Sequence, residues 1–238
     1  MVVLGIETAT RAGSVALVRE GESLAEYLVS HISTHSEWLL KGIDQILSDA
    51  GMALSGCDAI AVSIGPGSFT GLRIGVSTAK ALAYAIHKPI LGISTLEALS
   101  YNLLYTPHYI CPMIDARKNE VFTALYQWIQ GELKVLIPER AIPPLEMIHQ
   151  LDCSQRTIFP GNGSFLYGKL IQAEFGAQAE FPPPYHNLPR ASIVAGLGLS
   201  RLTQGQRDSV ETLVPKYLRL SDAEISWVKN HGDQTLSH

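Results

Sequence analysis

The chain has 238 residues, of which 46% are hydrophobic and 17% charged, so it can bury a sizeable core and is not a disordered segment. Its formal net charge of -4 and the lack of a Lys/Arg run argue against a protein that binds nucleic acid unaided by neutralising many phosphates. No window approaches the roughly 18 apolar residues of a membrane helix, and no basic leader precedes the apolar start, so we expect a cytoplasmic protein without a membrane anchor.

The first half of the chain predicts a three-stranded meander followed by alternating helices and strands. Short apolar runs bounded by polar turns are typical of buried strands, and apolar residues at three- and four-residue intervals are typical of helices. The predicted strands are residues 2–6, 14–18, 24–28, 59–64 and 90–93, and the predicted helices are residues 35–50 and 72–86.

The second half repeats this order with less regular spacing. In each copy an acidic residue, Glu7 or Asp115, stands at the end of the first strand, before a tight connection and a second apolar strand. We interpret this as a duplication. The predicted strands of the second copy are residues 109–115, 120–128, 133–137 and 157–159, and its predicted helices are residues 145–151, 165–175 and 192–203.

Two copies of a meander with alternating helices and strands predict an α/β protein with two lobes and a cleft between them. We assign residues 1–105 to the first lobe and residues 106–238 to the second. Glu7 and Asp115 are then expected to lie near one another at the cleft.

Facing carboxylates of this kind hold a divalent cation or position a water in many phosphate-handling enzymes, but they also cap loops. No glycine follows Glu7 and Thr8 until Gly13, so the open, amide-lined turn that a triphosphate prefers is missing. We therefore expect a weakened nucleotide site and no bound metal.

The segment GPGSFTG at residues 65–71 joins a predicted strand to a predicted helix. Its glycines let the backbone approach another molecule and the helix N-terminus favours an anion, yet the same glycines also suit a tight turn. The Lys and hydroxyl of the Walker pattern are absent at their required spacing. The loop at residues 161–164 has the same setting. The nucleotide and cleft candidates are Glu7, Thr8, Gly65, Gly67, Asp115, Gly161 and Gly163.

Other catalytic and metal-binding patterns are missing. His31 and His35 form a literal HxxxH, but they fall in different predicted elements and need not converge. Neither HExxH nor GxSxG occurs. Cys57, Cys111 and Cys153 lack metal-ligand spacing and are predicted to be buried, reduced thiols. The sequence therefore predicts no catalytic residue and no metal ligand.

The two helices predicted in the first half carry apolar residues on more than one face. This pattern indicates either packing against a sheet or a helix–helix docking face for another subunit. The candidates for a partner interface are His35, Trp38, Leu39, Ile43, Ile46, Leu72, Arg73, Val76 and Ala79.

Four segments resemble, in order and spacing, the bacterial TsaB (YeaZ) family. They are IETAT with GSVAL within residues 6–17, HSEWL at 35–39, GPGSFTGLRIG at 65–75 and DARKNEV at 115–121. The resemblance is close over the first 125 residues and looser afterwards, where PKYLR at 215–219 is the clearest match. It implies the two-lobed fold of acetate kinase, Hsp70 and actin.

The resemblance also implies a role as a non-catalytic partner subunit in attaching threonylcarbamoyl to the adenosine beside the tRNA anticodon. Such a subunit docks on the related transferase TsaD, reaches the ATPase TsaE through that complex, and forms a homodimer through the same helices when alone. It contacts tRNA mainly through the complex. Weak ATP or ADP binding at a partner interface is compatible with this role.

Proteins of the TsaD type bind a metal through an HxxxH motif placed after the helix that follows the glycine loop. The corresponding stretch here, residues 94–98, contains no His, which favours a scaffold over a transferase. The alternative functions are a metal-dependent, glycoprotease-like peptidase and a small-molecule kinase of the same superfamily. A kinase should carry a glycine close after its first acidic residue and an adenosine loop in the second lobe, and neither is recognisable.

Overall fold

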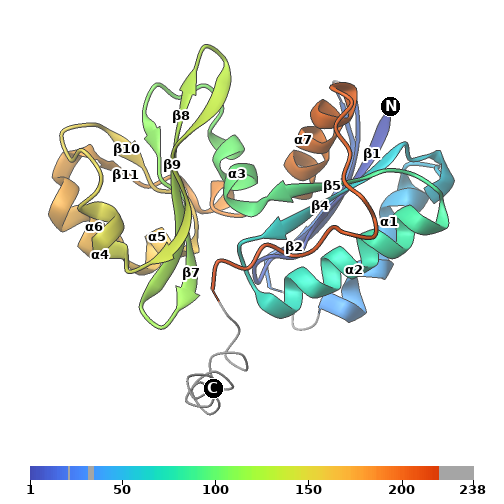
Figure 1. The fold of residues 1–238 in the computed structure, drawn as a ribbon, viewed down its shortest axis with the longest axis horizontal. Coiled ribbons are helices and arrows are strands. Elements are labelled where there is room, and N and C mark those ends of the chain that lie inside the picture. The colour runs from blue at the N-terminus through green and yellow to red at the C-terminus, as the bar shows by residue number, and fades with distance from the viewer. Residues whose placement is uncertain (21, 32–34, 220–238) are drawn as a thin grey trace, which may run out of the picture.

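The computed structural model describes residues 1–20, 22–31 and 35–219, and it consists of two α/β lobes, each built around one sheet (Figure 1). None of the helices in these ranges is both long and apolar enough to cross a bilayer. The strands are β1 (Val2–Glu7), β2 (Gly13–Arg19), β3 (Glu22–Val29), β4 (Ala59–Gly65), β5 (Ile90–Ser94), β6 (Tyr109–Ile110), β7 (Met113–Arg117), β8 (Glu120–Ile129), β9 (Glu132–Ile142), β10 (Thr157–Ile158) and β11 (Ala179–Glu180). The helices are α1 (His35–Asp49), α2 (Phe69–Ala85), α3 (Thr95–Ser100), α4 (Pro144–Ile148), α5 (Asn162–Leu166), α6 (Gly168–Phe175) and α7 (Ala191–Thr203).

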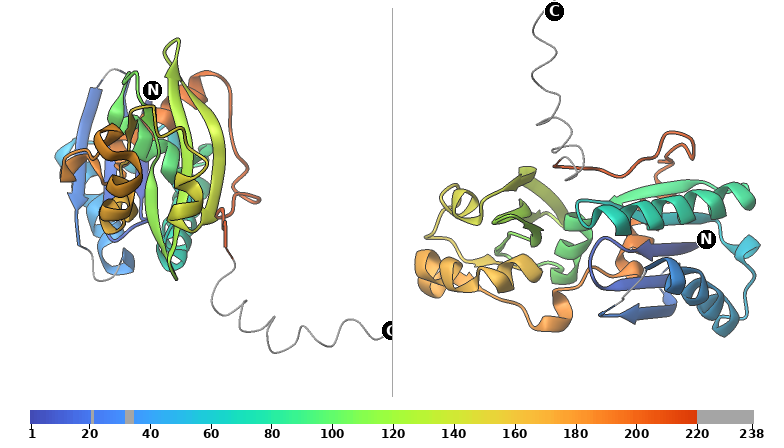
Figure 2. Two further views of the ribbon diagram at one scale, coloured as in Figure 1. Left: turned by 90° about the vertical axis from the view of Figure 1, so that its left-hand side faces the viewer. Right: turned by 90° about the horizontal axis from the view of Figure 1, so that it is seen from below.

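The first sheet has the strand order β3-β2-β1-β4-β5, with β1 at its centre. β1 pairs antiparallel with β2 and parallel with β4, and all six of its residues are buried. Its unbroken apolar run is explained by helices on both faces of the sheet, because α1 and α2 cover one face and α7 covers the other (Figures 1 and 2). The apolar side chains that recur along α1 and α2 therefore pack against the sheet and form part of the core of this lobe.

The second sheet repeats the topology of the first, which confirms the predicted duplication of the meander. β8 pairs antiparallel with β9 on one edge and with β6 and β7 on the other, and β10 and β11 follow in parallel. The prediction of one strand over residues 109–115 is wrong, because the ladder is interrupted between Ile110 and Met113. Pro112 lies in this gap and has no N–H to donate.

Three helices differ from their predicted bounds by more than one residue, and one of them is α4, which ends at Ile148 and not at residue 151. α2 begins at Phe69, inside the glycine-rich segment, because the side chain of Ser68 caps it by accepting a hydrogen bond from the Gly71 amide (3.3 Å). The helix predicted over residues 165–175 is two shorter helices, α5 and α6, since Tyr167 between them leaves helical dihedral angles. The glycine-rich loop is thus shorter than expected, because residues 69–71 belong to α2.

α7 follows the second lobe in sequence but packs on the first sheet. A Cβ added at Gly5 of β1 would overlap the carbonyl oxygen of Ala191, and one added at Gly198 would lie 2.5 Å from Cβ of Ala61. Small residues on both elements therefore let α7 lie directly on β1 and β4. The chain therefore returns to the first lobe at α7. The predicted boundary at residue 105 describes only the point at which the chain first passes from the first lobe to the second, and we retain it as a proposal for that point.

The contact between α7 and β4 can be tested with two glycines of the same helix. We expect Gly198→Ala to lower the free energy of unfolding by about 1–3 kcal/mol, because the added methyl overpacks the contact with Ala61. Gly196→Ala is the matched control: nothing lies within 4 Å of its added Cβ, so helix propensity should raise stability by up to about 1 kcal/mol. Urea unfolding measures both, and equal effects would contradict the close packing of α7.

Candidate functional site

A cleft of about 900 Å³ lies between the lobes. The first lobe contributes the connection between β1 and β2 and the first turn of α2, and the second lobe contributes the end of β7 and the helix α5. Residues 216–219 also line it. The cleft predicted from the duplication is therefore present, and both copies of the duplicated unit contribute to it.

Glu7 does not lie at the cleft, contrary to our expectation. Its side chain is completely buried, and it accepts hydrogen bonds from the Ala9 amide (2.5 Å) and from Oγ of Ser63. Burial raises the pKa of Glu7 to about 7, and the two hydrogen bonds oppose this rise. Asp115, by contrast, lines the cleft and accepts a hydrogen bond from the Arg117 amide (2.8 Å). Only one of the two expected carboxylates is thus available to a ligand.

The glycines of the first loop bring two parts of the chain together. A Cβ at Gly67 or Gly71 would overlap the carbonyl oxygen of Ala9 or Thr8, respectively. The Ser68 amide donates to the Ala9 carbonyl (2.7 Å), and Oγ1 of the fully buried Thr8 donates to the Gly71 carbonyl (2.8 Å). Of the two interpretations of this loop, the structure therefore favours tight packing over an open anion site. Gly67 still lines the cleft, whereas Thr8 and Gly65 do not.

The glycines of the second loop also pack against backbone, here against the first residue of β7. A Cβ at Gly161 would overlap the carbonyl oxygen of Met113, and one at Gly163 would lie 2.9 Å from it. Oδ1 of Asn162 accepts a hydrogen bond from the Asp115 amide (3.1 Å), and the Gly161 amide donates to Oδ1 of Asn187 (2.9 Å). Both glycines are buried outside the cleft lining, so they also serve packing within the chain.

The cleft contains residues that the sequence did not single out. Phe165 and Leu166 of α5 are 84% and 60% exposed, and Arg11 and Arg117 bring positive charge from the two lobes. Nothing in the sequence distinguished an exposed Phe165 from the apolar residues of a helix core. His31 also lines the cleft, and the side chain of His35 lies outside the described residues.

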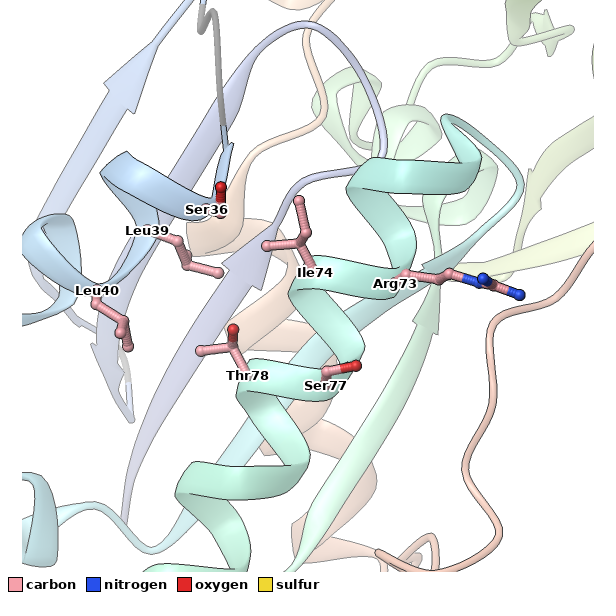
Figure 3. Close-up of a pocket in the computed structure, with 7 residues that line it drawn as sticks. All are labelled: Ser36, Leu39, Leu40, Arg73, Ile74, Ser77 and Thr78. Carbon is pink, nitrogen blue, oxygen red and sulfur yellow. The ribbon is translucent and has the colours of Figure 1, made fainter.

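A second hollow, which we call the groove, lies between α1 and α2 and has a volume of about 340 Å³ (Figure 3). Leu39 and Leu40 point from α1 toward α2, and Ile74 and Thr78 point back toward α1. Leu40 is 54% exposed, so an apolar side chain here faces solvent. The lining residues are Ser36, Leu39, Leu40, Arg73, Ile74, Ser77 and Thr78.

Most of the predicted interface residues belong to the core and not to the groove. Among the nine candidates, Arg73 is exposed and lines the groove, and Leu39 reaches it while being only 1% exposed. Trp38 is half-buried and stacks on Tyr27 of β3 with ring centroids 6.0 Å apart. The helices use their apolar stripes to cover the sheet, so these stripes cannot also meet a partner. The candidates buried in this way are Leu39, Ile43, Ile46, Leu72, Val76 and Ala79.

The described residues contain no group of three or more His, Cys, Asp or Glu side chains close enough to hold a metal ion. Cys57, Cys111 and Cys153 are free thiols; the first two are buried, whereas Cys153 is partly exposed. Burial raises the pKa of Cys57 to about 11 and that of Cys111 to about 12. Both buried thiols are thus held in the unreactive, protonated form.

Comparisons with known proteins agree with this architecture. A family model described as TsaD, tRNA N6-adenosine threonylcarbamoyltransferase, matches residues 26–227. A protein of Bacillus subtilis named tRNA threonylcarbamoyladenosine biosynthesis protein TsaB is 33% identical over 97% of this chain and 99% of its own length. The chain belongs to the TsaB (YeaZ) family. The TsaB of Haemophilus influenzae, 30% identical over 98% of both chains, carries the same name, which associates the family with threonylcarbamoyladenosine biosynthesis on tRNA.

Solved structures show the same fold. YeaZ from Pseudomonas aeruginosa is 31% identical and has a TM-score of 0.75, covering 91% of this chain and 99% of its own. The ethanolamine utilization protein EutJ from Carboxydothermus hydrogenoformans is only 10% identical, with a TM-score of 0.50 over 82% of this chain and 88% of its own, and shows the shared fold alone. The two-lobed, actin-like fold expected for a TsaB-family chain is thus confirmed.

Burial of Glu7 predicts a pH-dependent stability. In the unfolded chain this carboxyl ionises near pH 4.5, whereas in the folded chain it remains protonated until about pH 7. The stability that neutral Glu7 contributes is therefore fully present below pH 4.5 and is lost as the pH rises to 7, a loss of about 3 kcal/mol. Glu7→Gln, which is neutral throughout, should gain about this amount relative to wild type across the same range.

Urea unfolding at intervals from pH 4.5 to pH 8 measures this difference. Glu37→Gln, at an exposed position of α1, is the control and should follow the wild-type profile. Parallel profiles for wild type and Glu7→Gln would show that the buried carboxyl does not control the pH dependence.

Proposed function

We propose that this chain is a non-catalytic partner subunit that docks on TsaD and is required for threonylcarbamoyl transfer to the adenosine beside the tRNA anticodon. The groove between α1 and α2 is the observation that carries this proposal. Its exposed Leu40 and the flanking Ile74 form an apolar floor on an otherwise polar helix surface. An apolar groove between two helices suits a helix of a partner protein.

The rim of the groove supports close approach of a helix. Ser36, Ser77 and Thr78 are short, polar side chains that leave space for a neighbouring backbone and can hydrogen-bond at the edge of an interface. The volume of about 340 Å³ has room for a few side chains of a docked helix. The match to the TsaD family model supports a partner of related fold, which would present equivalent helices.

Both glycine loops pack within the chain, and this supports a subunit that catalyses no reaction itself. The Glu7 carboxyl is buried away from the cleft, and the glycines of both loops pack against backbone carbonyls. A triphosphate would need these same amides and this same approach of the backbone. We therefore propose weak ATP or ADP binding, at most, at a partner interface.

The remaining partners follow from this docking. We propose that the groove joins two copies of the chain when TsaD is absent, because an apolar hollow is covered in either complex. TsaE and tRNA are then reached through the complex with TsaD. The overall charge of -4 is consistent with little tRNA binding by this chain alone.

Leu40→Glu tests the docking site. The change places a charge in the apolar groove, so the Kd for the TsaD of the same organism should rise at least about tenfold, and tRNA threonylcarbamoylation should fall with it. Because Leu40 is 54% exposed, the variant should remain folded, unlike Ile43→Glu or Val76→Glu, which would disrupt the core. Binding is measured by calorimetry and modification by incorporation of labelled threonine.

Val135→Glu is the matched control, because Val135 is 58% exposed on β9, in the other lobe. It should bind TsaD like the wild type. Equal affinity of the Leu40→Glu and wild-type chains would place the docking site elsewhere. Turnover of a substrate by the isolated chain would overturn the non-catalytic role itself.

A further inference from the structure

Residues 215–219, which we call the strap, cross from the first lobe to the second at the edge of the cleft (Figure 1). Before the strap, the chain is held on α2, where Nζ of Lys80 donates to the carbonyls of Glu211 (3.1 Å) and Leu213 (3.0 Å). The Lys216 amide then donates to the Ile64 carbonyl of β4 (2.7 Å). The start of the strap is thus fixed on the first lobe.

The side chains of the strap reach the second lobe. Nζ of Lys216 lies 2.7 Å from Oε2 of Glu139 on β9, and Arg219 lies 3.2 Å from Oε2 of Glu120 on β8. The Glu139 side chain is only 9% exposed, and Tyr126 also donates to it (3.2 Å). The side chains of the Arg219–Glu120 pair are 22% and 30% exposed, so each anchor has at least one member that is largely removed from solvent and both resist screening better than a pair on the open surface.

A stack of three side chains connects the strap with the groove. The guanidinium of Arg73 lies 4.1 Å from the centre of the Phe69 ring, and its Nε donates to the hydroxyl of Tyr217 (3.3 Å). The rings of Phe69 and Tyr217 are 4.8 Å apart. Arg73 lines the groove, yet it points away from α1 (Figure 3), and both aromatic rings line the cleft. The stack therefore spans α2 from one hollow to the other.

We propose that the strap sets the separation of the two lobes and that Arg73 couples it to the groove, so that a partner in the groove and the width of the cleft influence each other. The second part rests on the docking proposed above. A partner that contacts Arg73 alters the interactions of the Arg73 side chain with the Phe69 ring and with the Tyr217 hydroxyl. Tyr217 directly follows Lys216, the residue that anchors the strap to Glu139. By thermodynamic linkage, an altered strap must change partner affinity in return.

The first experiment needs no partner. Spin labels at Ser55→Cys in the first lobe and Lys169→Cys in the second report the distance between lobes, in a Cys153→Ser background because Cys153 is the partly exposed thiol. Lys216→Met removes the anchor to Glu139 and should lengthen or broaden the distance distribution measured by double electron–electron resonance. Lys134→Met, which removes a surface pair with Glu132 inside the second lobe, should not. Identical distributions for all three chains would overturn the role of the strap.

The same labels test Arg73. Arg73→Ala and Tyr217→Phe should each shift the distance distribution, and the double variant should shift it no further than Arg73→Ala alone, because both changes remove the bond between Arg73 and Tyr217. Tyr217→Phe keeps the ring and removes only the hydroxyl, so it should not impair folding. Ser77→Ala, on the same helix and the same groove, is the control. An Arg73→Ala distribution that matches the Ser77→Ala one would overturn the coupling.

Partner affinity provides the reciprocal measurement. Tyr217 is not part of the groove lining, but Tyr217→Ala should change the Kd for TsaD by about fivefold. If Leu40→Glu weakens binding and Tyr217→Ala leaves the Kd unchanged, the proposed docking site is supported and the proposed coupling is refuted. If neither variant changes the Kd, both the docking site and the coupling are refuted. The distance measurements then decide by themselves whether the strap sets the separation of the lobes.

Discussion

The backbone contact between the β1–β2 connection and the start of α2 positions the elements that form both the groove and the cleft. The Ser68 amide binds the Ala9 carbonyl, and the absence of side chains at Gly67 and Gly71 lets the two segments meet at this distance. This contact sets the position of α2 relative to β1, and therefore the geometry of the groove that α2 forms with α1. It also forms one wall of the cleft, because the same residues line it.

Both copies of the duplicated unit pack a glycine loop against backbone, but at different points. In the second lobe, Gly161 and Gly163 approach the carbonyl of Met113, the first residue of β7, whereas the first pair approaches the connection that follows β1. The acidic residues then diverge: the carboxylate at the end of β1 finds a hydroxyl donor and an amide inside the core, whereas Asp115 stays at the cleft. A topological repeat thus constrains backbone placement more strongly than it constrains the chemistry of the equivalent side chains.

The order of the elements and the two-lobed fold could be predicted, because alternation and helical periodicity report burial directly. They do not report what covers a buried face, so Ile43 and Val76 looked equally suited to a sheet and to a partner subunit. The exposed Leu40 lies next to the predicted stripe, and only the packing of α1 separates it from Leu39. The strap was recognised only as a family-like segment, because an irregular connection has no periodicity from which its long-range contacts can be inferred.

The groove and the cleft both lie along α2 and share Ile74 in their linings, and this arrangement limits how they can influence each other. The backbone of α2 is held by its own hydrogen bonds and by the sheet, so a small change in the groove is not transmitted by bending the helix. A side chain that leaves the groove and contacts a segment anchored on both lobes is a more direct route. Arg73 meets this requirement, since its contacts are to one ring on its own helix and one hydroxyl on the strap. Such contacts can be exchanged for contacts to a partner without unfolding either lobe, which is what the proposed coupling between the groove and the strap requires.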